Sequence, residues 1–261
     1  MKVLVIMGSP RKGNTCRAVQ RIEEQMRSRA GPGGEVTFTY LMLRDADLRP
    51  CRGCFACFEK GEEHCPIKDD APAIEAQMHE ADGVIFASPV YGMNVTGLFK
   101  TFVDRFAYIF HRPRFFDKKA LLVTTTGMVG AKDVLKYMHL AATVWGFEVV
   151  HRVGLVTLAD PLPPALAAEN EKKLAAAADA FLEALRRGQR RPPSFNDVLM
   201  FHGQRATFAE LETIFPVDYA FWKERGWLEK GTKYFVKDVR VNPLYHLAGS
   251  VMEWFVRRQV R

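Results

Sequence analysis

The sequence predicts an α/β fold in which a parallel β-sheet is covered by helices on both faces. Two observations lead to this prediction: a continuous apolar run at Lys2–Met7, and four further strand-like runs that alternate with helical stretches. A strand that is apolar on both faces is typical of the centre of a parallel sheet. Strands that alternate with helices indicate crossover connections.

The predicted elements follow one another regularly. A helix is expected at 15–29, because apolar residues from Ala18 to Met26 recur at helical spacing, and the Gly-Pro-Gly-Gly segment at 31–34 ends it. Residues 44–70 are predicted to be irregular. The remaining strands are expected at 35–41, 83–87, 120–125 and 147–157, and the remaining helices at 72–80, 97–110, 132–145 and 165–187.

The composition changes near residue 189, where a Gln-Arg-Arg-Pro-Pro segment begins. We therefore expect a sheet domain at 1–188, which includes a cysteine-rich loop at 51–65, and a mostly helical extension at 189–261. The extension is rich in aromatic residues but too short for a large core of its own. We expect it to dock on the sheet domain or on a neighbouring subunit.

Charge and hydropathy limit the possible partners. Lys and Arg number 37 against 30 Asp and Glu, a formal charge of +7 that is spread along the chain. Nucleic-acid binding would rest on this charge alone, without a recognition motif, and is not predicted. No apolar stretch reaches the roughly 18 residues that a membrane span needs. The apolar run before Gly8 is too short for a signal peptide, so a cytoplasmic protein is expected.

The loop after the first strand is a candidate phosphate site. Residues 8–15 (Gly-Ser-Pro-Arg-Lys-Gly-Asn-Thr) join a buried strand to the start of a helix, where free N–H groups and the helix dipole favour an anion. Short donors and positive charges converge there: Ser9, Arg11, Lys12, Asn14 and Thr15. The loop matches neither the P-loop nor the dinucleotide fingerprint. The alternative is an ordinary strand–helix turn with a threonine cap.

Two further loops are expected beside the first one. Ligands of open α/β sheets bind at the carboxyl edge of the strands, where the segments 88–94 and 124–127 begin. Tyr91 offers a ring for stacking, and the backbone around it can bond a polar ring edge. The alternatives are a surface aromatic for Tyr91 and simple β-propensity for the threonine run.

These motifs together resemble the flavodoxin-like NAD(P)H-dependent FMN reductases and their relatives, the iron–sulfur flavoproteins. The resemblance rests on segments 8–15, 88–94 and 97–105 in that order, and it spans about residues 1–160. It implies a five-stranded sheet of order 2-1-3-4-5, non-covalently bound FMN, NAD(P)H as co-substrate, small-molecule electron donors and acceptors, and a homodimer or homotetramer.

The resemblance also implies roles for particular residues. The phosphate would lie at Ser9, Arg11, Lys12, Asn14 and Thr15, the ring at Pro89, Val90, Tyr91, Gly92 and Asn94, and its edge at Thr125, Thr126 and Gly127. The cofactor carries the chemistry, so no catalytic acid–base residue is expected. The alternative function is an electron-carrier or regulatory flavoprotein without substrate turnover.

Four cysteines, Cys51, Cys54, Cys57 and Cys65, are crowded into one loop. Three thiolates at successive two-residue spacings can surround a compact inorganic centre. A zinc site fits this spacing poorly, a redox dithiol would need only Cys54 and Cys57, and structurally inert thiols remain an alternative. The resemblance to iron–sulfur flavoproteins implies one [4Fe–4S] cluster at these four cysteines.

Three other features receive structural interpretations. Asp104 and Arg105 are expected to form an ion pair or a subunit contact. The basic segment 111–114 is interpreted as a solvated connector, with steering of an anionic substrate or of the phosphates of a nicotinamide as the alternative. The stretch 244–260 is amphipathic and ends in arginines. It is expected to pack on the sheet domain or in a dimer interface, with contact to a membrane surface as the alternative.

Overall fold

The computed structural model describes residues 1–31, 35–158 and 161–260, so the predicted helix stop at 31–34 lies partly outside the described residues. The chain divides into two compact units. The sheet unit comprises Met1–Cys51, Asp69–Phe106 and Asp117–Gln189, and the helical unit comprises Arg52–Lys68, Ala107–Phe116 and Arg190–Arg261. Each unit has its own core.

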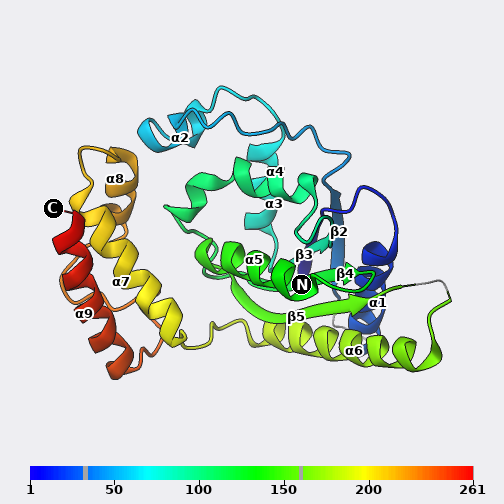
Figure 1. Cartoon of the computed structure of the whole chain (residues 1–261). Helices are drawn as coiled ribbons and strands as arrows, with labels where there is room; N and C mark the ends of the chain where they lie inside the picture. Colours follow the sequence, from blue (N-terminus) through cyan, green and yellow to red (C-terminus); the bar gives the residue numbers. More distant parts are fainter. Residues whose placement is uncertain (32–34, 159–160, 261) are drawn as a thin grey trace. The chain divides into compact units, whose positions relative to one another are not determined.

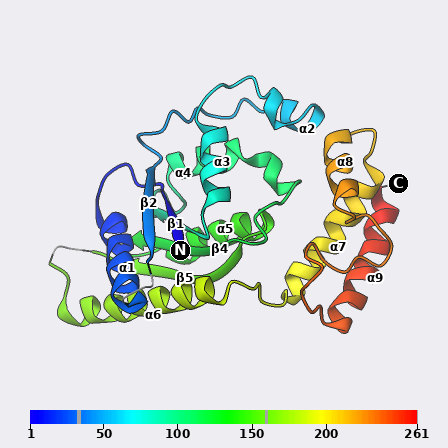
Figure 2. The same cartoon turned by 180° about the vertical axis from the view of Figure 1, so that it is seen from behind.

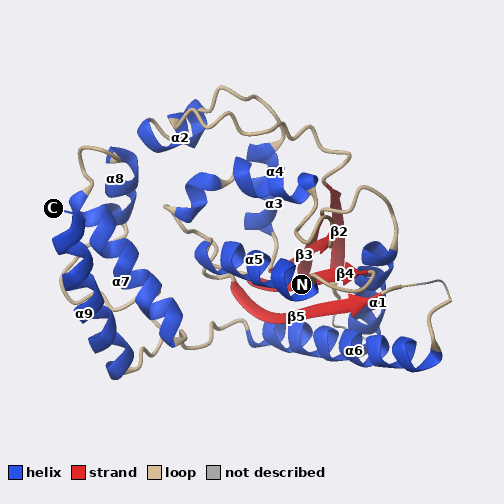
Figure 3. Ribbon diagram, viewed as in Figure 1, coloured by secondary structure: helices blue, strands red, loops and turns tan. Residues whose placement is uncertain are grey.

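The sheet unit contains five parallel strands in the order β2-β1-β3-β4-β5 (red in Figure 3), which confirms the predicted fold class. The register places Met7 opposite Ala87, and Ser88 opposite Thr124. The carboxyl ends of the three central strands therefore meet at one edge. The strands are β1 (Lys2–Met7), β2 (Thr37–Met42), β3 (Gly83–Pro89), β4 (Lys119–Thr126) and β5 (Glu148–Val156).

Helices cover both faces of this sheet. Side chains such as Val3 and Val5 pack with α1 (Asn14–Ala30) and α6 (Pro164–Arg187), which lie side by side in the opposite views of Figure 1 and Figure 2. On the other face Phe86 contacts the rings of Phe99 and Phe102. The helices of that face are α3 (Ala71–Glu80), α4 (Gly97–Arg105) and α5 (Ala131–Val144).

The structure corrects two expectations about α4. The predicted helix at 97–110 ends at Arg105, and a separate 3₁₀ turn, η2 (Ala107–Phe110), follows it. Asp104 and Arg105 do not pair with each other, because Arg105 points inward and binds Asp69 through two contacts of 2.8 and 3.0 Å, whereas Asp104 pairs with Lys100. Burial raises the pKa of Asp69, but the Arg105 hydrogen bond and two backbone N–H groups outweigh it and lower the pKa.

The helical unit is built around aromatic side chains. Its helices are α2 (Ala56–Glu59), α7 (Phe195–Glu210), α8 (Pro216–Glu224) and α9 (Pro243–Val260), and a 3₁₀ turn, η1 (Glu62–His64), follows α2. Trp222 is fully buried and donates its indole N–H to the carbonyl of His111 at 2.7 Å. The buried core consists of Val198, Phe201, Phe208, Trp222, Trp227, Tyr234 and Phe235.

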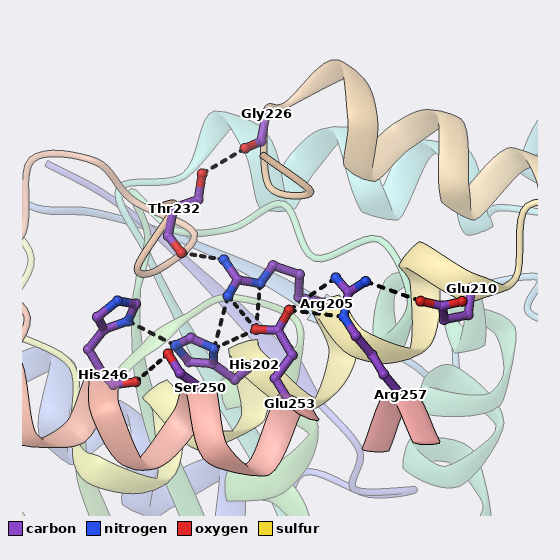
Figure 4. A network of polar contacts seen from close by, with 9 residues as sticks. All are labelled: His202, Arg205, Glu210, Gly226, Thr232, His246, Ser250, Glu253 and Arg257. Atoms are coloured by element: carbon purple, nitrogen blue, oxygen red, sulfur yellow. Dashed lines mark hydrogen bonds and ion pairs between the residues drawn. The ribbon is translucent and has the colours of Figure 1, made fainter. Parts of the chain in front are cut away.

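A polar network joins α7 to α9 (Figure 4). Glu253 of α9 accepts hydrogen bonds from Arg205 at 2.9 Å, and its carboxylate lies 2.9 Å from the ring of His202. His202 in turn contacts His246 at 3.1 Å. Burial raises the pKa of Glu253, but the hydrogen bonds from His202 and Arg205 and the charge of Arg205 dominate and lower it to about 2.

Within residues 1–31, 35–158 and 161–260, every helix is too short or too polar to span a bilayer.

Candidate functional site

Three loops emerge at the carboxyl edge of the sheet, after β1, β3 and β4. These strands are neighbours and parallel, so the loops at 8–13, 90–96 and 127–130 start from one edge. All three belong to the sheet unit. The predicted FMN residues are therefore gathered at the position where open α/β sheets bind ligands.

The first loop leaves the start of α1 open to an anion. Gly13 occupies the cap position of α1, no side chain caps the helix, and its first turn holds no acidic residue. Ser9 is buried and donates its hydroxyl to the carbonyl of Arg11 at 2.7 Å, which folds the loop on itself. The cationic side chains of Arg11 and Lys12 are exposed. Uncapped N–H groups, the helix dipole and two nearby cations are the features that favour an anion at a helix start.

Thr96 ties this loop to the end of β3. Its hydroxyl donates to the carbonyl of Gly8 at 2.6 Å and accepts from the backbone N–H of Phe99 at 3.2 Å, so it also caps α4. Its own backbone N–H donates to Ser88 Oγ at 3.1 Å. Gly8 has no room for a side chain, because a Cβ there would lie 2.8 Å from the Cβ of Phe99. Thr96, which has no local sequence signature, thus fixes the position of the loop after β1.

The second loop forms a small hairpin that presents Tyr91. Tyr91 and Asn94 exchange two backbone hydrogen bonds of 2.9 and 3.0 Å. Between them Gly92 and Met93 both have left-handed φ values, 52° and 66°, which a tight turn of this kind requires. A methionine in this conformation stores strain. The turn leaves the side chains of Tyr91 and Met93 about half exposed, at 46% and 53%.

The third loop begins where the β4 threonines end. Thr125 Oγ1 lies 2.6 Å from Thr15 Oγ1, and both side chains are buried. This contact links the start of α1 to the end of β4. Thr126 bonds the carbonyl of Val129 and so shapes the loop that follows, in which Gly127 is exposed.

The predicted FMN residues therefore occupy two kinds of position. Some are buried in the framework of the site, and others are exposed at its edge, where they are accessible to a ligand. The buried ones are Ser9, Thr15, Thr125 and Thr126; Asn14, Pro89 and Val90 are half-buried; Arg11, Lys12, Tyr91, Gly92, Asn94 and Gly127 are exposed. Thr96 lies outside the predicted segments, and Ser88 and Thr124 lie within them but were given no individual role; all three belong to the framework.

The four cysteines are divided between the two units. Cys51 ends a segment of the sheet unit, and Cys54, Cys57 and Cys65 belong to the helical unit. Cys51 and Cys54 are exposed, whereas Cys57 and Cys65 are half-buried. Among the residues that the structure describes, no three His, Cys, Asp or Glu side chains are grouped closely enough to hold a metal ion.

Arg112 anchors the cysteine segment inside the helical unit. Its side chain is 1% exposed and donates to the carbonyl of Cys57 at 2.8 Å and to Glu62 at 2.8 Å. It also bonds Asp218 of α8, whose side chain is completely buried. The expectation of a solvated connector at 111–114 was wrong, because Arg112 is neutralised internally by carboxylates from distant parts of the sequence.

Further contacts extend this anchor. Arg114 pairs with Glu62 at 2.8 Å, and the ring of His111 packs on Phe58 with centroids 4.4 Å apart. Burial raises the pKa of Glu62, but the charges of Arg114 and Arg112 outweigh it and lower the pKa. The segment between Cys57 and Cys65 is thus held by an ion-pair network that includes α8 of the C-terminal extension.

The comparison with protein families decides the identity of the sheet unit. Residues 1–159 match the model of the NADPH-dependent FMN reductases. The chain belongs to this family. Proteins named iron–sulfur flavoproteins are similar to this chain, and one from Archaeoglobus fulgidus is 31% identical over 230 residues, covering 87% of this chain and all of the relative. Another from Methanosarcina thermophila is 30% identical over 154 residues, covering 58% and 77% of the two chains.

Solved structures show the same fold. RosB, a structure containing a formylated riboflavin 5′-phosphate, superposes with a TM-score of 0.56 at 14% identity and covers 93% of this chain and 92% of its own. An FMN-dependent NADH-azoreductase from Bacillus anthracis gives a TM-score of 0.51 at 14% identity, covering 69% and 98%. With its family, this protein is an FMN-dependent oxidoreductase that uses NAD(P)H and small-molecule electron acceptors.

Proposed function

We propose that this FMN reductase holds the FMN phosphate at the uncapped start of α1 and the flavin ring against the loops after β3 and β4. The observation that carries the proposal is the convergence of those loops on a helix start that no side chain caps. The phosphate ligands would be Ser9, Arg11, Lys12, Asn14 and Thr15; the ring contacts would be Pro89, Val90, Tyr91, Gly92 and Asn94, with Thr125, Thr126 and Gly127 at the edge.

When bound, FMN supplies the redox chemistry, accepting a hydride from NAD(P)H and releasing electrons to an acceptor. The chain itself binds and orients. The backbone N–H groups at the start of α1 neutralise the phosphate, and the exposed ring of Tyr91 offers a stacking surface beside the flavin. No side chain is assigned a proton-transfer role.

Replacement of Arg11 by alanine tests the phosphate site. Charge-assisted hydrogen bonds contribute about 1.5–3 kcal/mol, so Arg11→Ala is expected to weaken FMN binding by roughly 10- to 100-fold. The matched control is Arg27→Ala, which removes the same charge in the last turn of α1, where Arg27 pairs with Glu23. Equal FMN dissociation constants for the two variants, measured by flavin fluorescence, would show that the phosphate lies elsewhere.

We further propose that Cys51, Cys54, Cys57 and Cys65 bind one [4Fe–4S] cluster. The support is the donor set: four thiols within fifteen residues, in a chain whose full-length relative is named an iron–sulfur flavoprotein. Left-handed turns at Gly53 and Gly61 lie between the cysteines and allow the segment to fold tightly. A cluster there would carry single electrons. Thiolate ligation fits a reducing, cytoplasmic location.

Iron and sulfide analysis tests the cluster directly. Anaerobically purified wild type is expected to contain about four of each per chain, and Cys54→Ser is expected to lose them while retaining FMN. Cys16→Ser is the control, because Cys16 is buried in α1, where burial raises the pKa of its thiol. Wild type that stays free of iron after reconstitution with iron and sulfide would overturn the cluster proposal and leave the FMN site standing.

We also propose that the protein works as a homodimer or homotetramer. Five large apolar side chains on the outward face of α9 support association, because faces of this kind are seldom left in water.

A further inference from the structure

Helix α9 carries a polar network on its inward face and large exposed apolar side chains on its outward face. Its polar side chains, including Glu253 and Arg257, point toward α7 and form the buried network of Figure 4. The two helices approach closely at Gly249, where a Cβ would lie 2.2 Å from the ring of His202. The inward face also carries Tyr245, which packs on the aromatic core, and the large apolar side chains that remain exposed lie on the outward face.

The outward face carries a continuous apolar stripe, which we call the α9 stripe. Its side chains are between 50% and 72% exposed, although each is large and hydrophobic. Isolated exposed hydrophobic residues are common on protein surfaces, but a contiguous patch of this size marks an interaction site. The α9 stripe consists of Leu244, Leu247, Val251, Trp254 and Phe255.

The spacing of the stripe indicates that a helix covers it. Leu244, Leu247, Val251 and Trp254 are separated by three, four and three residues. This alternation is the seam of two helices that pack along each other, with apolar residues at the a and d positions. A continuation of the pattern reaches Arg258, whose guanidinium stacks on Trp254 at 3.7 Å from the ring centroid.

We propose that the α9 stripe of a second copy of this chain covers this face, with the two α9 helices antiparallel. The proposal rests on the self-association stated under the proposed function and names its surface. Fully exposed side chains of this size offer on the order of 200 Å² each, so two half-exposed stripes of five side chains would bury about 1,000 Å² together, which reaches the roughly 1,000 Å² expected of a specific interface.

The direction follows from charge and from the distribution of side chains. A parallel pair would place Arg258 of one copy against Arg258 of the other, with no exposed acid on the stripe to neutralise them. An antiparallel pair centred on Val251 places the two Arg258 residues about 20 Å apart, because a helix rises 1.5 Å per residue. With the twofold axis at Val251, the aliphatic half of one stripe, which begins at Leu244, covers the aromatic half of the other.

A charge-swap experiment at Val251 tests this arrangement. Two opposed glutamates or two opposed lysines would repel across the axis, so Val251→Glu and Val251→Lys are each expected to weaken self-association by roughly 100-fold or more. A one-to-one mixture of the two variants is expected to restore the assembly, because a glutamate then faces a lysine. Analytical ultracentrifugation of the FMN-loaded protein measures all three samples. The control is Ile214→Glu, which adds the same charge at an exposed apolar residue outside α9.

Three outcomes would overturn the proposal, and each identifies what failed. Wild type that is monomeric at tens of micromolar would remove the self-association itself. An oligomeric wild type that Val251→Glu leaves unchanged would keep the association but place it on another surface. Binding of wild type to vesicles of phosphatidylglycerol and phosphatidylcholine, lost in Val251→Glu without rescue by mixing, would make a lipid surface the occupant.

Discussion

Replacing Asp218 by asparagine removes one charge from the centre of the network that holds the cysteine segment. The Asp218 side chain is completely buried, bonds Arg112 and lies 2.6 Å from the ring nitrogen of His111. Asparagine keeps the shape and leaves the buried guanidinium paired with Glu62, whose side chain is 29% exposed, and bonded to the carbonyl of Cys57. Loss of one partner of a buried pair costs about 3–5 kcal/mol, and we expect about 3 kcal/mol because Glu62 remains.

Hydrogen exchange measured by mass spectrometry is the assay for this variant, because it reports the two units separately. A loss of about 3 kcal/mol corresponds to roughly 150-fold faster exchange through opening of the helical unit. We expect this acceleration in peptides of segment 54–65 and of α7 and α8, and unchanged exchange in β1, β3 and β4. Because Arg112 contacts both Cys57 and Asp218, we expect the cysteine segment and α8 to open together.

The control is Asp179→Asn, the same substitution at an exposed ion pair. Asp179 lies 2.7 Å from Arg29, and its side chain is 59% exposed. Exposed pairs contribute about 0–1 kcal/mol, so exchange should change by less than about fivefold. The reasoning about the anchor would be refuted if Asp218→Asn left segment 54–65 at its wild-type rate, or accelerated exchange equally in the sheet unit.

Two further variants test the site and the α7–α9 contact. Thr96→Val removes the cap of α4 and leaves the Gly8 carbonyl without this donor. It should therefore lower the free energy of unfolding by about 2 kcal/mol and weaken FMN binding. Urea unfolding measures the first effect, and flavin titration measures the second. The pKa of Glu253 is about 2 in the folded protein, below its unfolded-state value of about 4.3. The ionised carboxylate therefore adds stability that is fully present above the unfolded-state pKa and is lost as the pH falls toward 2. Glu253→Gln should flatten that acid limb in urea unfolding followed from pH 6 to 2, and an unchanged limb would contradict the assignment.

Periodicity and turn chemistry predicted the strands and most helices of the sheet unit, whereas the strand order came from the resemblance to the FMN reductases. The predicted first strand and the observed β1 have the same bounds, Lys2–Met7, because a run that is apolar on both faces fits few positions other than a buried central strand. The three loops were predicted at one edge because parallel strands share a direction, and the comparison with known families confirms the cofactor class. The end of α4 was misplaced by five residues, because the 3₁₀ turn Ala107–Phe110 continues a nearly helical apolar pattern.

The polar contacts that fix the site could not be predicted from periodicity or turn chemistry. The hydroxyl of Thr96 bonds a carbonyl 88 residues away, and Arg112 finds Asp218 across 106 residues. Such pairs depend on which surfaces the fold brings together, and neither partner has a local sequence signature. Arg112 in particular lies in a basic segment that is typical of an exposed connector, and only its burial identifies it as an anchor.

Titration of flavin-free protein with FMN and with riboflavin tests most directly whether the start of α1 binds the phosphate. The two ligands share the ring and differ only in that group. If the N–H groups and cations of residues 9–15 hold it, riboflavin should bind at least roughly 100-fold more weakly than FMN, and the difference should shrink as salt is added. Equal dissociation constants for FMN and riboflavin would contradict the site.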